Sequence, residues 1–168
     1  NPNGVMDTVA ARIVNTLVGN DENEAVLEMH FPAAEIEFDG GCSFSIGGAD
    51  FSAVLNEAPV GNWTSLIANQ GHVLRFTRPL SGTRAYLAVA GGFAVDEWLG
   101  SRSTNLLARV GGYEGRKLQQ GDRLELRAPG TVKPHSIGPS IIPKYSRFPT
   151  VRVVASGEFD LLTAISER

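Results

Sequence analysis

The chain has 168 residues, enough for one domain, or for one domain and part of another, with a sizeable buried core. Its 15 Lys and Arg residues against 18 Asp and Glu residues give a net charge of −3, which argues against nucleic-acid binding. The apolar residues occur in short runs, so neither a transmembrane helix nor a membrane partner is expected. Cys42 is the single cysteine, which excludes an intrachain disulfide and favours a cytoplasmic protein. The three histidines lack metal-ligand spacing, so no metal is predicted.

Helical periodicity is clearest in residues 7–18. Val9, Ile13 and Leu17 recur every four residues, as on one face of an amphipathic helix. Asp7 is suited to cap the N-terminus and Gly19 to end the helix. The pattern therefore predicts one helix here.

From residue 25 onward the pattern is typical of strands. Short apolar runs separated by turn residues occupy 26–31, 35–38, 42–46, 51–55, 72–77, 84–90 and 123–127. The turn signals lie at 39–41, 47–50, 56–59 and 69–71, a spacing of roughly ten residues that suits a barrel or sandwich. The near-continuous apolar run before Gly91 indicates a strand covered on both faces. The predicted fold is mainly β with few helices.

The later part of the chain predicts a domain boundary. A short helical turn is expected at 96–100, and a proline-rich connector without regular structure at 129–149. A β-rich run at 150–155 and helical spacing at 158–165 follow it. One strand and one helix cannot bury a core alone, so 150–168 is predicted to begin a second unit, and the chain to be a fragment.

A polar loop at 101–105 is the first candidate site. Ser101, Ser103 and Thr104 surround Arg102, and such donors suit a carboxylate or phosphate. The alternative is that a serine caps a helix through 106 and 107 while Arg102 pairs with a nearby carboxylate.

Two further positions carry a functional and a structural interpretation. Asp50 can present a carboxylate as a base or orienting group, or accept backbone N–H bonds in an Asx turn. Gly91 and Gly92 can serve a ligand loop or a plain turn. The sequence contains neither a G-x-S-x-G elbow nor a Walker-type phosphate loop.

Several colinear motifs resemble one known family. These are AYLAVAGG at 85–92, GSRST at 100–104, GG-x-EGR at 111–116, the G-x-M-D segment ending at Asp7, and Gly48-Ala49-Asp50 in place of a T-G-A-D turn. Together they resemble the biotin-dependent carboxyltransferase family, which includes the C subunit of ATP-dependent 5-oxoprolinase, allophanate hydrolase subunit 2, KipA-type proteins and part of urea carboxylase. Gly47 departs from the pattern, because it stands where the family has threonine.

The resemblance implies a fold and a division of the chain. It implies a cyclophilin-like β-barrel unit at 1–128 that lacks the family's first strand, the connector at 129–149, and the beginning of a second, truncated subdomain at 150–168.

The resemblance also implies an activity. We expect one component of an amide hydrolase that converts 5-oxoproline to glutamate. Its implied partners are a LamB/YcsF-type A subunit together with a KipI-type B subunit, and the complex would use ATP. Asp50 and Arg102 are the implied catalytic residues, and Ser101, Arg102, Ser103, Thr104, Gly91 and Gly92 the implied substrate contacts. The alternatives are biotin-dependent carboxyl transfer to urea or another amide, and a KipA-type regulatory binding module.

Overall fold

The computed structural model of the protein describes residues 4–146, 148–152, 154 and 157. One helix and eight strands occur in this part of the chain: α1 (Thr8–Leu17), β1 (Leu27–Met29), β2 (Ile36–Glu37), β3 (Cys42–Asp50), β4 (Ala53–Leu55), β5 (Ala58–Pro59), β6 (Ser65–Ala68), β7 (Val73–Phe76) and β8 (Ser81–Val89). The predicted mainly β fold with few helices is confirmed.

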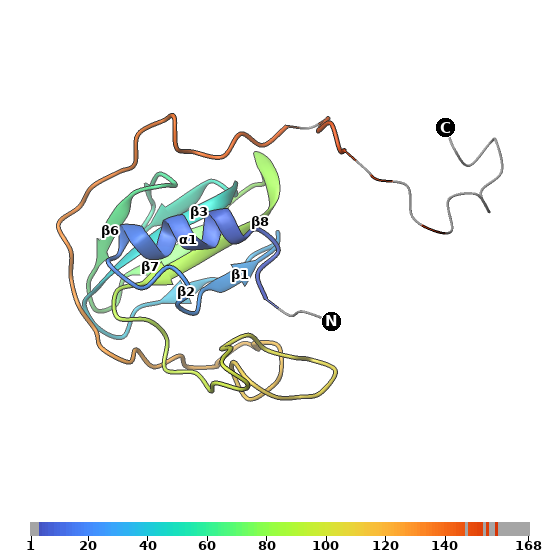
Figure 1. The fold of residues 1–168 in the computed structure, drawn as a ribbon. Coiled ribbons are helices and arrows are strands. Elements are labelled where there is room, and N and C mark those ends of the chain that lie inside the picture. The colour runs from blue at the N-terminus through green and yellow to red at the C-terminus, as the bar shows by residue number, and fades with distance from the viewer. Residues whose placement is uncertain (1–3, 147, 153, 155–156, 158–168) are drawn as a thin grey trace.

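The strands form two antiparallel sheets of four strands each (Figure 1). One sheet has the order β1-β8-β3-β6 and the other the order β2-β7-β4-β5. Helix α1 lies across the first sheet, as Figure 1 shows. The molecule therefore has three layers: the helix, the β8-containing sheet and the β7-containing sheet.

Two hydrophobic cores lie on opposite faces of the first sheet. Leu87 and Val89 of β8 point into the core between the sheets, together with Phe44 of β3 and Leu74 of β7. The intervening Tyr86, with Ala88 and Ala90 beside it, packs against α1. Because side chains alternate along a strand, both faces of β8 are covered, as the apolar run predicted.

The helix prediction is confirmed at both ends. The Asp7 carboxylate accepts the backbone N–H of Ala10 at 3.0 Å, which is the bond of an N-cap. Gly19 follows the C-cap residue Val18 with a φ of 74°.

The turn predicted at 47–50 is wrong, because these residues complete β3. Gly47 instead gives α1 and Trp63 room to pack: a Cβ there would lie 2.6 Å from both Trp63 Cζ3 and Val14 Cγ1. The glycine permits close approach between elements and makes no turn.

Gly47→Ala is expected to lower the free energy of unfolding by about 1 to 2 kcal/mol, because the added methyl group overpacks the helix interface. Gly61→Ala is the matched control, since nothing lies within 4 Å of the corresponding Cβ. Urea unfolding of both variants measures the difference. Equal stability of the two variants would contradict tight packing at Gly47.

Two other regular elements were predicted and are absent from the described residues. Residues 96–100 form a tight turn instead of a helix, with a β-bridge between Trp98 and Ser101 and positive φ angles at Leu99 and Gly100. Residues 123–127 form no strand; Leu126 alone bridges to Phe93. The prediction also missed β6.

The segment 129–149, predicted as a connector, contains no helix or strand in its described part. It runs along the first sheet, where Gly130 O accepts the N–H of Ser43 at 2.9 Å and His135 O accepts that of Ser65 at 2.8 Å. The described residues of the predicted β-rich run, 150–152 and 154, form no strand. The predicted helix at 158–165 lies outside the described residues.

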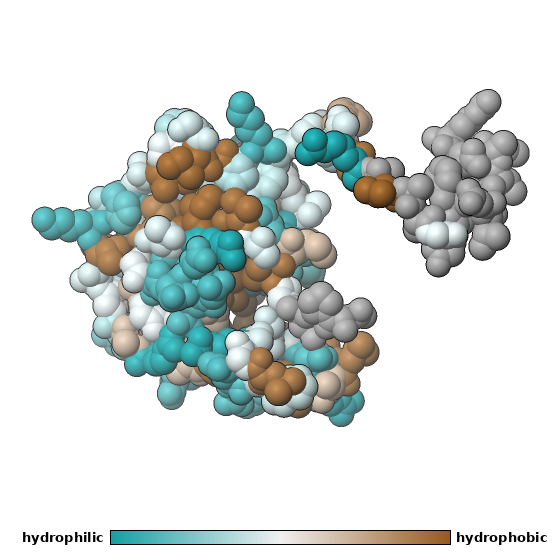
Figure 2. Space-filling view, in the orientation of Figure 1, coloured by the Kyte–Doolittle hydropathy of each residue, from teal (hydrophilic) through white to brown (hydrophobic). Residues whose placement is uncertain are grey.

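Residues 93–127 form an irregular lobe below the sheets in Figure 1. Figure 2 shows hydrophobic and hydrophilic residues mixed on this lobe, and Leu99 and Leu107 are among its most exposed apolar side chains. Arg116 holds part of the lobe together through two hydrogen bonds to Asp122, of 2.7 and 2.9 Å.

The Arg116–Asp122 pair predicts acid sensitivity of the lobe. The hydrogen bonds from Arg116 and from the backbone N–H of Gln119 lower the pKa of Asp122 to about 2. Because the pKa is depressed in the folded state, the pair stabilises the lobe above the unfolded value of about 3.9 and loses this effect as pH falls toward 2.

Asp122→Asn is expected to be less stable than the parent protein at pH 6, and this difference should shrink steadily below about pH 4. Thermal unfolding at several pH values measures it. A difference that stayed constant down to pH 2 would show that Asp122 is not held by Arg116.

Candidate functional site

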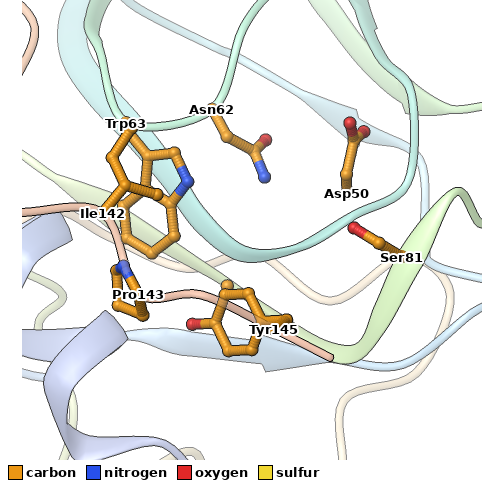
Figure 3. A pocket seen from close by; sticks show the side chains of 8 residues that line it. Asp50, Asn62, Trp63, Ser81, Ile142, Pro143 and Tyr145 are labelled. Carbon is orange, nitrogen blue, oxygen red and sulfur yellow. The ribbon is translucent and has the colours of Figure 1, made fainter. Parts of the chain in front are cut away.

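A cleft of about 390 Å³ opens where β3 ends and β8 begins (Figure 3). Strand residues, a loop before β6 and the connector contribute its walls. The lining residues are Gly48, Asp50, Asn62, Trp63, Ser81, Ile142, Pro143 and Tyr145. Of the residues predicted from the sequence, only Asp50 lies here.

Asp50 is placed by an irregularity in the sheet. The register of β3 against β8 shifts between Gly48 and Asp50, and Asp50 then pairs with Ser81. One carboxylate oxygen accepts the N–H of Ser52 at 2.8 Å, which is the bond of an Asx turn. No described residue binds the second oxygen, so Asp50 can still accept a hydrogen bond.

Asn62 and Trp63 form the wall next to β3. Trp63 donates its backbone N–H to Ile46 O at 2.7 Å, and the residue is 8% exposed. The Asn62 side-chain amide donates to Ala49 O at 3.0 Å. These contacts hold the loop against the last residues of β3.

Tyr145 brings the connector to the cleft. Its hydroxyl donates to the Asp7 carboxylate at 2.7 Å, and the Tyr86 hydroxyl oxygen accepts the Asp7 backbone N–H at 2.8 Å. Burial raises the pKa of Tyr86, and burial together with the Asp7 bond raises the pKa of Tyr145. Both hydroxyls therefore stay protonated at neutral pH, and the N-cap of α1 anchors the connector.

Arg102 lies in a separate cluster of charges. Its guanidinium is 3.0 Å from the Glu97 carboxylate and 3.7 Å from that of Glu24, and Arg127 also pairs with Glu24. The Glu24 side chain is 8% exposed. The charge of Arg102 is therefore compensated by two carboxylates, as in the structural alternative for this residue.

The other residues of the polar loop at 101–105 bond or contact one another and their neighbours, with Ser101 exposed and Ser103 and Thr104 half-buried. Ser101 Oγ accepts the N–H of Ser103 at 3.2 Å, and a Cβ on Gly112 would lie 2.0 Å from Thr104 Oγ1. No helix begins here; Asn105 instead caps a turn by accepting the N–H of Ala108 at 3.0 Å.

Gly91 and Gly92 lie where chain segments meet. A Cβ on Gly91 would be 1.7 Å from Ala128 O, and one on Gly92 would be 2.7 Å from the Glu24 carboxyl carbon. Both have positive φ angles. Their lack of side chains is thus required by the neighbouring residues Ala128 and Glu24.

The structure places Asp50 and Arg102 at opposite ends of β8. Asp50 pairs with Ser81 at the start of this nine-residue strand, whereas Gly92, near the Glu24 partner of Arg102, follows its end. At about 3.3 Å per residue the strand alone spans about 26 Å. Arg102 is not among the residues that line the cleft with Asp50, although the neighbouring Ser103 Oγ lies 3.7 Å from the Cβ position of Gly4, near the N-terminal end of α1.

Four cleft residues were not predicted from the sequence: Asn62, Trp63, Ser81 and Tyr145. They come from separate segments, and none is part of a motif. The cleft forms only because β3 and β8 pair and the connector returns to α1. No local sequence signal reports those contacts.

Among the described residues, no helix is long and apolar enough to cross a membrane. The same part of the chain contains no group of three metal-binding side chains arranged to hold an ion. Cys42 is buried, and this burial raises the pKa of its thiol.

A helix-covered β domain with a small polar cleft at one end of its paired central strands is suited to bind a small polar molecule. The whole sequence, residues 1–168, matches the family described as carboxyltransferase domain, subdomain A and B. The chain belongs to this family.

Relatives named as urea carboxylases or amidolyases and relatives named as 5-oxoprolinase C subunits both support this assignment. The chain is 41% identical to a putative urea carboxylase of Emericella nidulans over 146 residues, and 42% identical to the 5-oxoprolinase C subunit of Escherichia coli over 123 residues. These matches cover 84% and 73% of the chain. The crystal structure of the K. lactis urea amidolyase superposes with a TM-score of 0.80 at 31% identity over 86% of the chain.

The chain spans only part of each relative. It covers 40% of the 5-oxoprolinase C subunit, 12% of the urea carboxylase and 9% of the urea amidolyase structure. The activities of those whole proteins are therefore carried over to this chain only as proposals.

Proposed function

We propose that this chain is part of the C subunit of an ATP-dependent 5-oxoprolinase complex, which hydrolyses 5-oxo-L-proline to L-glutamate. Family membership, with 42% identity to a 5-oxoprolinase C subunit over 123 residues, is the observation that carries the proposal. The partners are a LamB/YcsF-type A subunit together with a KipI-type B subunit, in the cytoplasm. The exposed leucines of the lobe favour contact with another protein surface.

Asp50 is the proposed catalytic residue of this chain. It lies at a cleft, and one of its carboxylate oxygens is not bonded by any described residue. A carboxylate in that position can accept the amide proton of a lactam or orient a water molecule. The remainder of the site would come from the rest of the complex.

The polar loop at 101–105, with Arg102 at its centre, is proposed only as a second anion contact. Ser101, Ser103, Thr104, Gly91 and Gly92 would contribute with Arg102, outside the cleft that Asp50 lines. A bound anion would have to replace Glu97, the more exposed of the two carboxylates that Arg102 contacts.

The described cleft residues do not fit ATP. Asp50 is the only charged residue among those lining the cleft, and a triphosphate requires cations or a cluster of backbone N–H groups. No step of the reaction is therefore assigned to ATP within this chain.

Biotin-dependent carboxyl transfer to urea or another amide is the second candidate function. The match to the putative urea carboxylase favours it, because that match extends over 84% of the chain. Biotin supplies a carrier for an activated carboxyl group. Its polar ureido ring suits the Asp50 carboxylate and the Ser81 hydroxyl of the cleft.

The test is glutamate release from 5-oxoproline by the reconstituted complex, measured with and without ATP and without biotin. We expect turnover that requires ATP but not biotin. Asp50→Asn should lower turnover at least about tenfold with assembly intact, because it removes a charged acceptor. Asp39→Asn is the control, since Asp39 is exposed and its nearest cation, Arg123, is 3.8 Å away.

Two results would count against this proposal. Biotin-dependent carboxylation of urea, without glutamate release from 5-oxoproline, would establish the second candidate in its place. Full turnover by the Asp50→Asn complex would remove Asp50 from the catalytic residues.

A further inference from the structure

The connector is attached to the domain in two different ways along its length. In its first part, residues 129–137, backbone groups bond to serines of the first sheet that are fully buried. Ser43 Oγ accepts the N–H of Val132 at 2.9 Å, and Ser65 Oγ accepts that of His135 at 2.9 Å. Because a buried hydroxyl left without a partner is costly, this first part is firmly attached.

Residues 138–146, which we call the arm, are attached by much less. Most of the arm is exposed, and the backbone N–H of Ile141 bonds within the arm itself, to Gly138 O at 3.0 Å. Among the described residues, a single hydrogen bond joins the arm to the helix or the sheets: the Tyr145 hydroxyl donates to the Asp7 carboxylate at 2.7 Å. Segments with few buried contacts and few hydrogen bonds open at the lowest cost in free energy.

The arm also forms one wall of the cleft. Ile142, Pro143 and Tyr145 are among the lining residues. In Figure 3 Ile142 lies beside the Trp63 ring, and Tyr145 lies across the hollow from Asp50. Ile142 is also packed against the helix-side core that contains Trp63. Displacing the arm would therefore uncover the Trp63 ring, which is 8% exposed with the arm in place.

We propose that the arm is a hinged cover that gates the cleft. The hinge lies at Gly138, because the preceding Ile137 still donates its backbone N–H to Trp63 O at 3.3 Å. Hinges are a few loop residues that absorb a backbone rotation, and small residues often serve. The latch is the hydrogen bond from Tyr145 to Asp7, which fastens the far end of the arm to the N-cap of α1.

The two positions of the arm give the cleft two states. With the latch broken, the arm swings away from Trp63 and a small molecule can enter; with the latch formed, the arm covers the cleft. Covers of this kind shield a bound molecule from water. The inference rests on the proposed function in placing the gate at the Asp50 site, but the motion does not depend on which reaction occurs there.

Quenching of Trp63 fluorescence by acrylamide tests the motion. The chain has two tryptophans, so Trp98→Phe in every protein compared leaves Trp63 as the emitting indole. Acrylamide is a small neutral molecule, and it must reach the ring to quench it. Tyr145→Phe removes the latch and keeps the aromatic ring, and losing a hydrogen bond to a carboxylate should raise the open fraction about tenfold. We expect the quenching constant of Trp63 to rise at least about twofold, with the urea midpoint nearly unchanged.

Three further variants make the result specific to the latch. Tyr113→Phe makes the same chemical change in the lobe and should leave the quenching of Trp63 unchanged. Asp7→Asn keeps a good N-cap but replaces the charged acceptor by a neutral one, so it should give a smaller rise of the same sign. Ser65→Ala removes an anchor of the firmly attached part and should lower the urea midpoint, unlike Tyr145→Phe.

The proposal is overturned if Tyr145→Phe leaves the quenching constant at the parent value. It is also overturned if Tyr113→Phe raises that constant equally, or if the rise comes with a matching loss of global stability, because general unfolding would then uncover Trp63. Turnover of 5-oxoproline by a complex in which the latch variants do not change Trp63 quenching would remove the gate and keep the proposed function. A latch-dependent rise in a chain whose complex never hydrolyses 5-oxoproline would do the reverse.

Discussion

Glu24→Ala is expected to lower the free energy of unfolding by about 3 kcal/mol, because it leaves two arginines without their shared partner. The Glu24 side chain is almost fully buried, and both Arg102 and Arg127 contact its carboxylate. A Glu24 carboxylate oxygen also accepts the N–H of Ala25 at 2.9 Å. For a chain of this length the melting temperature should fall by about 8 °C.

Glu22→Ala is the control for this variant. Glu22 is half exposed and lies 3.8 Å from Arg12, an arrangement that contributes at most about 1 kcal/mol. Thermal and urea unfolding of the two variants measures the difference in stability. The same measurements on Arg102→Ala and on the Glu24→Ala/Arg102→Ala double variant give the coupling energy between Glu24 and Arg102. If Glu24→Ala lowered the free energy of unfolding no more than Glu22→Ala, Glu24 would not hold Arg102 in place. The prediction that the polar loop at 101–105 binds an anion would then gain support.

This coupling separates two roles of Arg102. If Arg102 links the lobe to the segment before β1, removing it lowers the free energy of unfolding but leaves ligand affinity unchanged. If Arg102 instead binds an anion, removing it lowers the affinity for that anion in a protein that still folds. Since Glu97 and Glu24 both face Arg102, we expect the stability effect to be the larger of the two.

The parts of the fold that follow periodic patterns were predictable from the sequence. The apolar run at 84–90 correctly indicated a strand buried on both faces, because any strand between a helix and a second sheet needs apolar side chains at every position. The spacing of Val9, Ile13 and Leu17 likewise predicted α1. In both cases local pattern and tertiary burial agree.

Glycines caused the main errors, because one residue type serves several purposes. The pair Gly47-Gly48 was predicted to form a turn, but Gly47 lies within β3 and accommodates Trp63, and Gly48 approaches Arg84 O. The helical turn predicted at 96–100 failed because Leu99 and Gly100 adopt positive φ angles. The sequence alone does not show whether a glycine serves a turn, a close approach between elements or a positive φ angle.

The candidate site was predictable only in part. Asp50 was identified because it follows two glycines in a family-like motif, and it does lie at the cleft. Trp63 and Tyr145 reach the same cleft through the pairing of β3 with β8 and through the Asp7 anchor. Long-range contacts of this kind leave no periodic signal in a single sequence.

Gly91→Ala is expected to lower the free energy of unfolding by about 3 kcal/mol or more. A Cβ at this position would lie 1.7 Å from Ala128 O, so the backbone after the lobe would have to move. The φ of 84° adds a conformational cost of about 1 kcal/mol for a residue with a side chain. The Gly91 N–H is also fixed by a 2.9 Å bond to the Asn20 side chain, which limits relief of the strain.

Gly121→Ala separates the two contributions, because Gly121 has a similar φ of 91° and nothing within 4 Å of its Cβ position. That variant should show the conformational cost alone, and the difference between the two variants in urea unfolding is the cost of the contact with Ala128. A Gly91→Ala protein as stable as Gly121→Ala would mean that Ala128 does not press on the end of β8. Gly91 and Gly92 would then have space to approach a ligand, as the motif predicted, and the role of Gly91 as a packing point between the end of β8 and Ala128 would be lost.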